Sequence, residues 1–188
     1  MKHNIFLEGW GCRLRPVALE DAEFIVNIRN ESFAKGCINA TGQSVADQKK
    51  WLESYFLRSG DFYWIIENTE GKGRIGTIGL YDIVGKEGMP GRWVMLPDAK
   101  FLASAPVTLV YEFAFEKIGL KRLLMDVVDS NKKVLKFHDL YGASRISYCP
   151  DKYLSQASPF QFIWFEITSE IWPRLKAKWV GLMEEANG

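Results

Sequence analysis

Residues 126–143, with the sequence DVVDSNKKVLKFHDLYGA, hold the side chains best suited to chemistry. Val134, His138 and Tyr141 are spaced by four and then three residues, which places them on one face of a helix. An imidazole and a phenol on that face can give or take protons at the carboxyl edge of a sheet. The alternative is structural, with His138 as a hydrogen-bonded core histidine and Tyr141 as a packing aromatic. Taken alone, this segment favours the structural interpretation.

A second candidate lies in residues 93–117, WVMLPDAKFLASAPVTLVYEFAFEK, which predict a strand, a loop and a helix. A helix N-terminus presents unpaired N–H groups and about half a positive charge, so it can bind a phosphate. Loops at such sites usually contain glycine, whereas residues 98–106 contain none and offer lysine and alanines instead. Pro106 fits the first helical position. On composition alone, a plain connection is the favoured interpretation.

The composition argues against several classes of function. Basic and acidic residues nearly balance to a net charge of +1, so neither nucleic acid nor a membrane is indicated as the partner. The three cysteines, Cys12, Cys37 and Cys149, are isolated and predict reduced thiols in the cytoplasm. With only two histidines in the chain, a metal site is not expected. The first residues predict neither a signal peptide nor a membrane span.

The hydrophobic pattern predicts one α+β domain over residues 1–188, in which a mixed, mostly antiparallel sheet has helices on both faces. Strands are expected at 12–18, 61–69, 74–84, 92–96, 122–129, 143–149 and 160–168, with a turn at 85–91. Helices are expected at 19–32, 45–57, 106–118, 131–141 and about 169–186. Ser44 should cap the second helix. The apolar stripe of the last helix should cover the sheet, with a homodimer contact as the second choice.

Together these segments resemble the GCN5-related N-acetyltransferase (GNAT) family, over residues 13–148. LRPVALEDAEFIVNIRNES resembles the start of the ribosomal-protein alanine acetyltransferase branch, and IGTIGLYDI resembles the family's second and third strands. Residues 94–123 lie where the family has its pyrophosphate loop, and residues 126–143 are the most specific match, because Asn131 and Gly142 have the family's spacing. Residues 29–55 also resemble members that acetylate amino sugars.

The resemblance implies an acyl-CoA N-acyltransferase-like fold, with acetyl-CoA as cosubstrate and no metal. The sheet would splay at a V-shaped cleft after the strand at 92–96, where main-chain groups near Met95 and Leu96 would pair with the pantetheine arm. Asn131 would contact the same arm. The residues implied to hold the diphosphate are Lys100, Phe101, Leu102, Ala103, Ser104 and Ala105.

The resemblance also implies catalytic roles. His138 stands where the family often has the tyrosine that protonates the departing thiolate, and histidine is a competent acid near neutral pH. Tyr141 is the second candidate catalytic residue. A base must take the proton of the amine, and Glu67, Asp82 and Glu112 all stay open for that role.

The implied reaction is direct transfer of an acetyl group to a primary amine of a small molecule, with a nucleotide-linked amino sugar as one acceptor class. Residues 32–43 and 151–159 would line the acceptor pocket, where Phe33 and Tyr153 would stack on the acceptor or fill the rim. One alternative is a non-catalytic binding module of the same fold. Another is an acetyltransferase acting on peptide N-termini.

Overall fold

The computed structural model describes residues 3–31, 44–71, 73–147 and 161–187, in which eight strands form one open sheet. Their order across the sheet is β1-β2-β3-β4-β5-β6-β8-β7. The strands are β1 Leu7–Gly9, β2 Cys12–Pro16, β3 Phe62–Asn68, β4 Gly73–Val84, β5 Glu87–Met95, β6 Arg122–Val128, β7 Ser144–Ile146 and β8 Phe162–Thr168. Neighbours are antiparallel except β5 and β6, which are parallel. The predicted mixed, mostly antiparallel sheet is confirmed.

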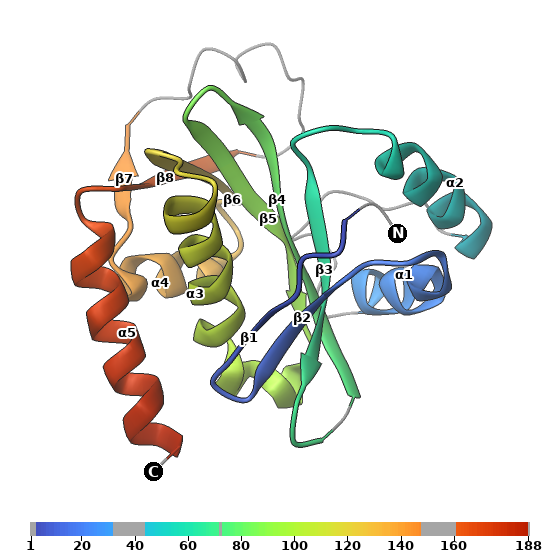
Figure 1. Cartoon of the computed structure of the whole chain (residues 1–188), viewed down its shortest axis with the longest axis horizontal. Helices are drawn as coiled ribbons and strands as arrows, with labels where there is room; N and C mark the ends of the chain where they lie inside the picture. Colours follow the sequence, from blue (N-terminus) through green and yellow to red (C-terminus); the bar gives the residue numbers. More distant parts are fainter. Residues whose placement is uncertain (1–2, 32–43, 72, 148–160, 188) are drawn as a thin grey trace.

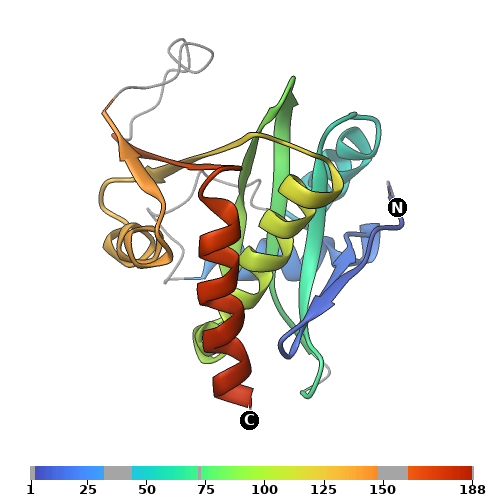
Figure 2. The same ribbon diagram turned by 60° about the vertical axis from the view of Figure 1, so that its left-hand side comes forward.

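Helices cover both faces of this sheet. The described α-helices are α1 Ala22–Asn30, α2 Val45–Phe56, α3 Ser104–Glu112, α4 Lys132–Tyr141 and α5 Trp172–Asn187. Figures 1 and 2 show α3 and α5 against one face and α1 and α2 against the other. The largest apolar cluster joins α3, α4 and α5 to the sheet, and a smaller one joins α1 and α2 to β3. Each face of the sheet is thus buried by its own group of helices.

Local residues explain where two of the helices begin and end. The Ser44 hydroxyl accepts a hydrogen bond from the backbone N–H of Asp47 at 3.0 Å, which caps α2 as predicted. The Asn131 side-chain oxygen accepts one from the N–H of Val134 at 3.3 Å and caps α4. Gly142 then ends α4 at a φ of 104°, a left-handed conformation that glycine adopts without a steric penalty.

The connection before α3 differs from the predicted loop. Residues Pro97–Leu102 form a 3-10 helix, and α3 begins at Ser104, two residues before the predicted start. Pro106 still lies in the first turn of α3, where its missing N–H costs no hydrogen bond. The helix then changes to a π-helix at Phe113–Lys117.

The predicted turn at residues 85–91 is wrong beyond Lys86. β5 already begins at Glu87 and includes Pro90. Proline removes a donor from a sheet, so it is tolerated where one side of the strand has no ladder partner. Pro90 meets this condition, because β5 has no described partner on its β6 side beyond Gly88. The edge strand β1 was not predicted.

The sheet splays between β5 and β6. β6 pairs with β8 along its whole length of seven residues, but it pairs with β5 only through Glu87–Arg122 and Gly88–Leu123. Residues 89–95 of β5 therefore have no described strand beside them on this side. The V-shaped opening that the family resemblance implies is present between the two parallel strands.

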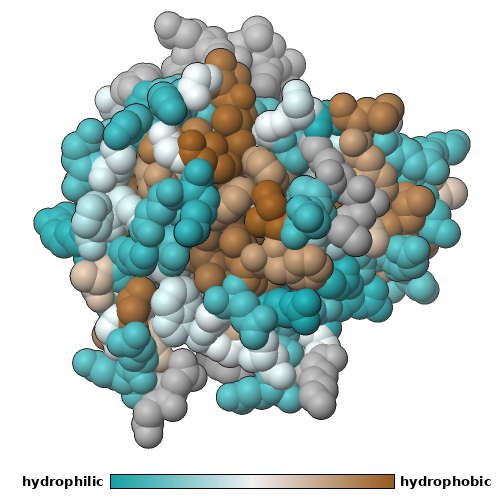
Figure 3. Space-filling model, in the orientation of Figure 1, coloured by the Kyte–Doolittle hydropathy of each residue, from teal (hydrophilic) through white to brown (hydrophobic). Residues whose placement is uncertain are grey.

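The apolar stripe of α5 packs inside the chain. Trp172, Leu175 and Met183 are at most 7% exposed and belong to the main core. Figure 3 shows further apolar surface on this face running up to the β4–β5 hairpin, where Val84 is 65% exposed. The stripe is thus used within the chain.

Candidate active site

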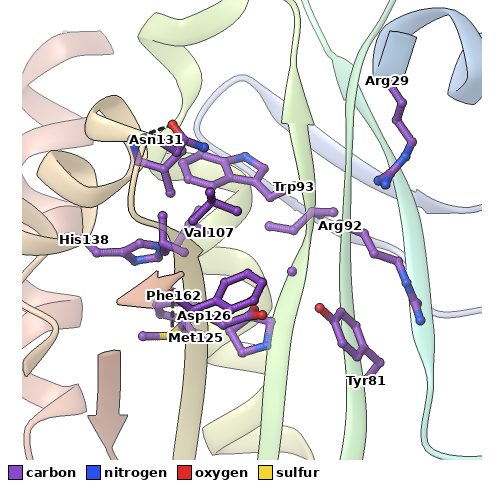
Figure 4. Close-up of a pocket in the computed structure, with 17 residues that line it drawn as sticks. Arg29, Tyr81, Arg92, Trp93, Val107, Met125, Asp126, Asn131, His138 and Phe162 are labelled. Atoms are coloured by element: carbon purple, nitrogen blue, oxygen red, sulfur yellow. Dashed lines mark hydrogen bonds between the residues drawn. The ribbon is translucent and has the colours of Figure 1, made fainter. Parts of the chain in front are cut away.

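A cavity of about 170 Å³ lies where β5 and β6 diverge. Its lining comes from α1, β4, β5, α3, β6, α4 and β8, and it includes Trp93, Asp126, Asn131 and His138 (Figure 4). A cavity of roughly 150 Å³ can hold a molecule as large as benzene. This one therefore has room for the end of an extended arm with a small reacting group.

The α4 wall of the cavity carries two of the predicted site residues. Asn131 caps α4 with its side-chain oxygen and also lines the cavity, and Val134 and His138 follow along the same helix. Trp93 reaches this wall from β5, and its ring centroid lies 4.7 Å from that of Phe137. Figure 4 shows Asn131, His138 and Trp93 on the same side of the opening.

His138 is held in an uncharged form. Its side chain is 6% exposed and lies 5.2 Å, between ring centroids, from Phe165. Burial lowers its pKa from 6.5 to about 4, and the nearby Asp139 carboxylate only partly opposes this. Nδ1 has no hydrogen-bond partner among the described residues. At neutral pH roughly one molecule in a thousand carries a protonated His138 ring. His138 can therefore act as an acid only when a negative charge develops beside it and raises the pKa of the ring.

Tyr141 is not brought into the cavity with His138. It is fully buried, its hydroxyl lies 2.9 Å from that of Thr108, and its ring stacks on Trp179 at 4.9 Å between centroids. Trp179 also donates a hydrogen bond from Nε1 to the Tyr141 carbonyl at 2.9 Å. Burial raises the pKa of the Tyr141 phenol. These contacts tie α4 to α3 and α5.

The residues expected at the arm and the diphosphate lie along the carboxyl end of β5 and the start of α3. The Leu96 N–H donates to the Ile75 carbonyl of β4 at 2.8 Å. Because successive peptide groups of a strand point to opposite sides, the N–H of Met95 faces away from β4, toward the gap. The Met95 side chain itself is buried in the main core.

The predicted diphosphate residues occupy the turn into α3. The backbone of Lys100, Phe101 and Leu102 belongs to the 3-10 helix, and the side chains of the first two lie outside the described part of the structure. Ala103 is the N-cap of α3, whose first turn contains Ser104 and Ala105. The Ala103 side chain makes no capping hydrogen bond to the first turn of α3.

A β-bulge in β5 sits at the mouth of the cavity. Thr77 pairs with Val94 and Gly79 with Gly91, so two residues of β5, Arg92 and Trp93, face one residue of β4. Arg92 has a φ of 50°, a left-handed conformation that costs a non-glycine residue about 1–2 kcal/mol. Figure 4 shows Arg92 and Trp93 pointing to opposite sides of the strand.

The opposite wall is charged. Arg29 from the last turn of α1, Tyr81 from β4 and Arg92 from β5 enter the cavity from the side away from α4 (Figure 4). Burial lowers the pKa of Arg29, and the positive charge of Arg92 adds to this effect.

Asp126 on β6 is a cavity residue that sequence reasoning missed. Burial raises the pKa of its carboxyl, and the negative charge of Asp82 raises it further. Within the described residues it forms no ion pair. The signal was present in the sequence, because Asp126 interrupts the apolar run LLMDVV of residues 123–128.

The three acids considered as bases do not line the cavity. Glu67 accepts a hydrogen bond from Arg15 at 2.7 Å, and Glu112 lies 3.5 Å from Lys176 of α5. Asp82 lies close enough to Asp126 to affect its pKa. The expected acceptor residues, Phe33 and Tyr153 with residues 32–43 and 151–159, lie outside the described residues.

Two general features bear on the type of site. None of the described helices has the length and apolar run needed to cross a bilayer. Within the described residues, no group of three or more His, Cys, Asp and Glu side chains could hold a metal ion.

Comparisons with known proteins agree with this geometry. The family model described as "Acetyltransferase (GNAT) domain" matches residues 12–144. A search of curated proteins found no significant match. Among solved structures, the chain is similar to apo FdhC, described as a nucleotide-linked sugar GNAT, with 27% identity and a TM-score of 0.80 over 95% of this chain and 98% of that one.

Two further structures share the fold. A GCN5-related N-acetyltransferase from Brucella melitensis has 15% identity and a TM-score of 0.81, covering 96% of this chain and 86% of that one. A variant of spermidine N-acetyltransferase SpeG from Vibrio cholerae has 14% identity and a TM-score of 0.70, covering 87% and 97%. Since the family model covers well over half of the sequence and the splayed sheet matches these folds, the chain belongs to the GNAT family of acetyltransferases.

Proposed function

We propose that this protein transfers the acetyl group of acetyl-CoA directly to a primary amine of a small molecule. The observation that carries the proposal is the unpaired edge of β5 beside a cavity lined by Asn131, His138 and Asp126. An extended arm can pair with such an edge as an added strand would. Its reactive end would then lie among the side chains able to move protons.

The proposed binding site for acetyl-CoA is formed by the N-terminus of α3 and the unpaired edge of β5. The peptide group of Met95 and the start of α3, with residues 100–105, are proposed to hold the arm and its diphosphate. Alanines in place of glycines limit how closely the backbone can approach the diphosphate. The diphosphate would therefore be bound both by backbone N–H groups and by the positive charge of Lys100. Asn131 is proposed to contact the arm from α4.

Asp126 and His138 are proposed to carry the two protons that the ammonium group must lose. Asp126 takes the first, since its raised pKa makes it a better base than an ordinary carboxylate. The nitrogen releases the second as it becomes an amide. His138 passes this proton to the sulfur, because the negative charge developing there raises the pKa of the ring.

The acceptor is proposed to be an amino sugar linked to a nucleotide. The wall with Arg29 and Tyr81 suits a polar acceptor, whereas the charge of Arg92 is already paired with Asp61. The likeness to FdhC, a nucleotide-linked sugar GNAT, supports the same class. Amines of other classes, including peptide N-termini, are the competing acceptors.

The test has two stages. Acetyl-CoA at millimolar concentration should raise the melting temperature by mass action. Release of free thiol is then followed with nucleotide-linked amino sugars, polyamines and peptides with free N-termini as acceptors, and the amino sugars are expected to react fastest. No thermal shift would favour a non-catalytic binding module, and turnover of peptides alone would identify a peptide N-terminal acetyltransferase.

A further inference from the structure

The side chain of Arg92 leaves the bulge of β5 and crosses the neighbouring strand. It passes over Gly79, where an added Cβ would lie 3.4 Å from the Arg92 Cδ. At its far end the guanidinium donates to both carboxylate oxygens of Asp61, at 2.5 and 3.0 Å. Asp61 directly precedes β3, so this side chain connects the cleft strand to the strand two positions away.

Three aromatic rings enclose this connection. The guanidinium carbon of Arg92 lies 4.2 Å from the ring centroid of Tyr81, 5.2 Å from that of Trp51 and 5.4 Å from that of Tyr63. The side chains of Arg92 and Asp61 are 16% and 8% exposed. A planar cation held between rings and a two-point carboxylate contact has little freedom to move.

The backbone of the same residue is held as well. The Thr77 hydroxyl, which is fully buried, donates to the Arg92 carbonyl at 2.8 Å. On the other side of the strand, Trp93 packs on Phe137 of α4. Both residues of the bulge are thus fixed, one toward β3 and the other toward α4.

A second ion pair offers a comparison for the connection at Arg92. Arg15 donates to both oxygens of Asp21 at 2.6 and 2.7 Å, and these side chains are 25% and 3% exposed. This pair joins β2 to the turn before α1, away from the cavity, and Arg15 has no left-handed backbone. Only the Arg92 pair acts on a strained residue at the cleft.

We propose that the Arg92–Asp61 pair, with Thr77, is a positioning device that holds the bulge of β5 and so sets the direction of the peptide groups that face the acyl group. This inference rests on the proposed acetyl transfer at the same cleft. The pair would act on turnover through the backbone and would touch neither the thioester nor the coenzyme.

The first test compares Asp61→Asn with Asp21→Asn, which removes the matching charge from the control pair. Both variants should melt at lower temperatures. Well below melting, Asp61→Asn should lower kcat by about tenfold to a hundredfold and change the KM for acetyl-CoA less than about threefold. Asp21→Asn should leave kcat within about twofold of the wild type. Equal losses of kcat in the two variants would overturn the proposal.

The second test uses Thr77, because changing it leaves no buried charge unpaired. Thr77→Val keeps the volume and removes the bond to the Arg92 carbonyl, so kcat should fall about tenfold. Thr77→Ser keeps the hydroxyl and should restore kcat to within about threefold. A Thr77→Val variant with full turnover, or a Thr77→Ser variant as slow as Thr77→Val, would contradict the inference.

A structural measurement separates this inference from the proposed function. In a crystal structure of Asp61→Asn, Arg92 should leave the left-handed region and the register of β5 should change. If the wild type turns over no acyl donor, the proposed function fails, and the crystal structure still decides whether the pair holds the bulge. An unchanged bulge in that variant would refute the positioning role.

Discussion

The two walls of the cleft differ in charge, although one cavity joins them. The α4 wall presents Val134, Trp93 and an uncharged His138, whereas the opposite wall presents Arg29, Arg92 and, from β6, Asp126. An apolar wall suits an uncharged thioester arm, and a charged wall suits a polar acceptor. The difference is consistent with the proposal that the arm and the acceptor occupy different walls of the cleft.

The largest effect is expected on the charged wall. Asp126→Asn removes the proposed proton acceptor and should lower kcat/KM by about a hundredfold or more. The acid limb of the wild-type pH–rate profile, set by the raised pKa of Asp126, should also disappear. Glu67→Gln is the control, because Arg15 holds Glu67 away from the cavity, and its activity should stay near that of the wild type. Equal losses in both variants would contradict the role of Asp126.

The α4 wall should respond less strongly. His138→Phe keeps the volume of a ring and removes the proton carrier, so kcat should fall by about tenfold to a hundredfold. Donor binding, measured as the thermal shift caused by acetyl-CoA, should change little because the arm is held elsewhere. Unchanged turnover would remove His138 from the mechanism, and a lost thermal shift would make it a binding residue.

The burial of His138 also predicts a dependence of stability on pH. Its folded-state pKa of about 4 lies below the usual 6.5, so the unfolded chain binds more protons between these values. Stability should therefore fall as pH falls through this range, by about 2 kcal/mol at pH 5 for this group. Denaturant unfolding at pH 5 and pH 8 should show a smaller drop in His138→Phe than in the wild type. Parallel losses in the two proteins would show that the ring is charged when folded.

The smallest effect is expected behind the α4 wall. Tyr141→Phe removes the hydroxyl that meets Thr108 and should cost about 1 kcal/mol of unfolding free energy. Turnover should stay within about twofold of the wild type, since this ring does not line the cavity. A loss of turnover without a loss of stability would return Tyr141 to the catalytic residues.

Much of the frame could be predicted from the sequence because its signals are local. Ser44, Asn131 and Gly142 mark helix ends through their own side chains or backbone freedom. The hairpin of β3 and β4 and the apolar β6 follow from hydrophobic pattern. The family resemblance supplied the splay between β5 and β6, which no local pattern encodes.

The features that were missed depend on distant contacts. Gly88, Pro90 and Gly91 look like a turn, yet they belong to β5, which beyond Gly88 has no described strand beside it on the β6 side. The bulge at Arg92 could not be predicted, because its left-handed residue is not a glycine. Arg92 binds Asp61, which is thirty-one residues earlier in the chain. His138 and Tyr141 share a helix face, but only the packing of α5 shows which of them reaches the cavity.

The most direct test of the central claim is a crystal structure of the protein with coenzyme A. The arm should lie between β5 and β6, beside the peptide group of Met95, with the diphosphate at the N-terminus of α3. Coenzyme bound at any other place, or β5 and β6 paired along their whole length with the gap closed, would contradict the account.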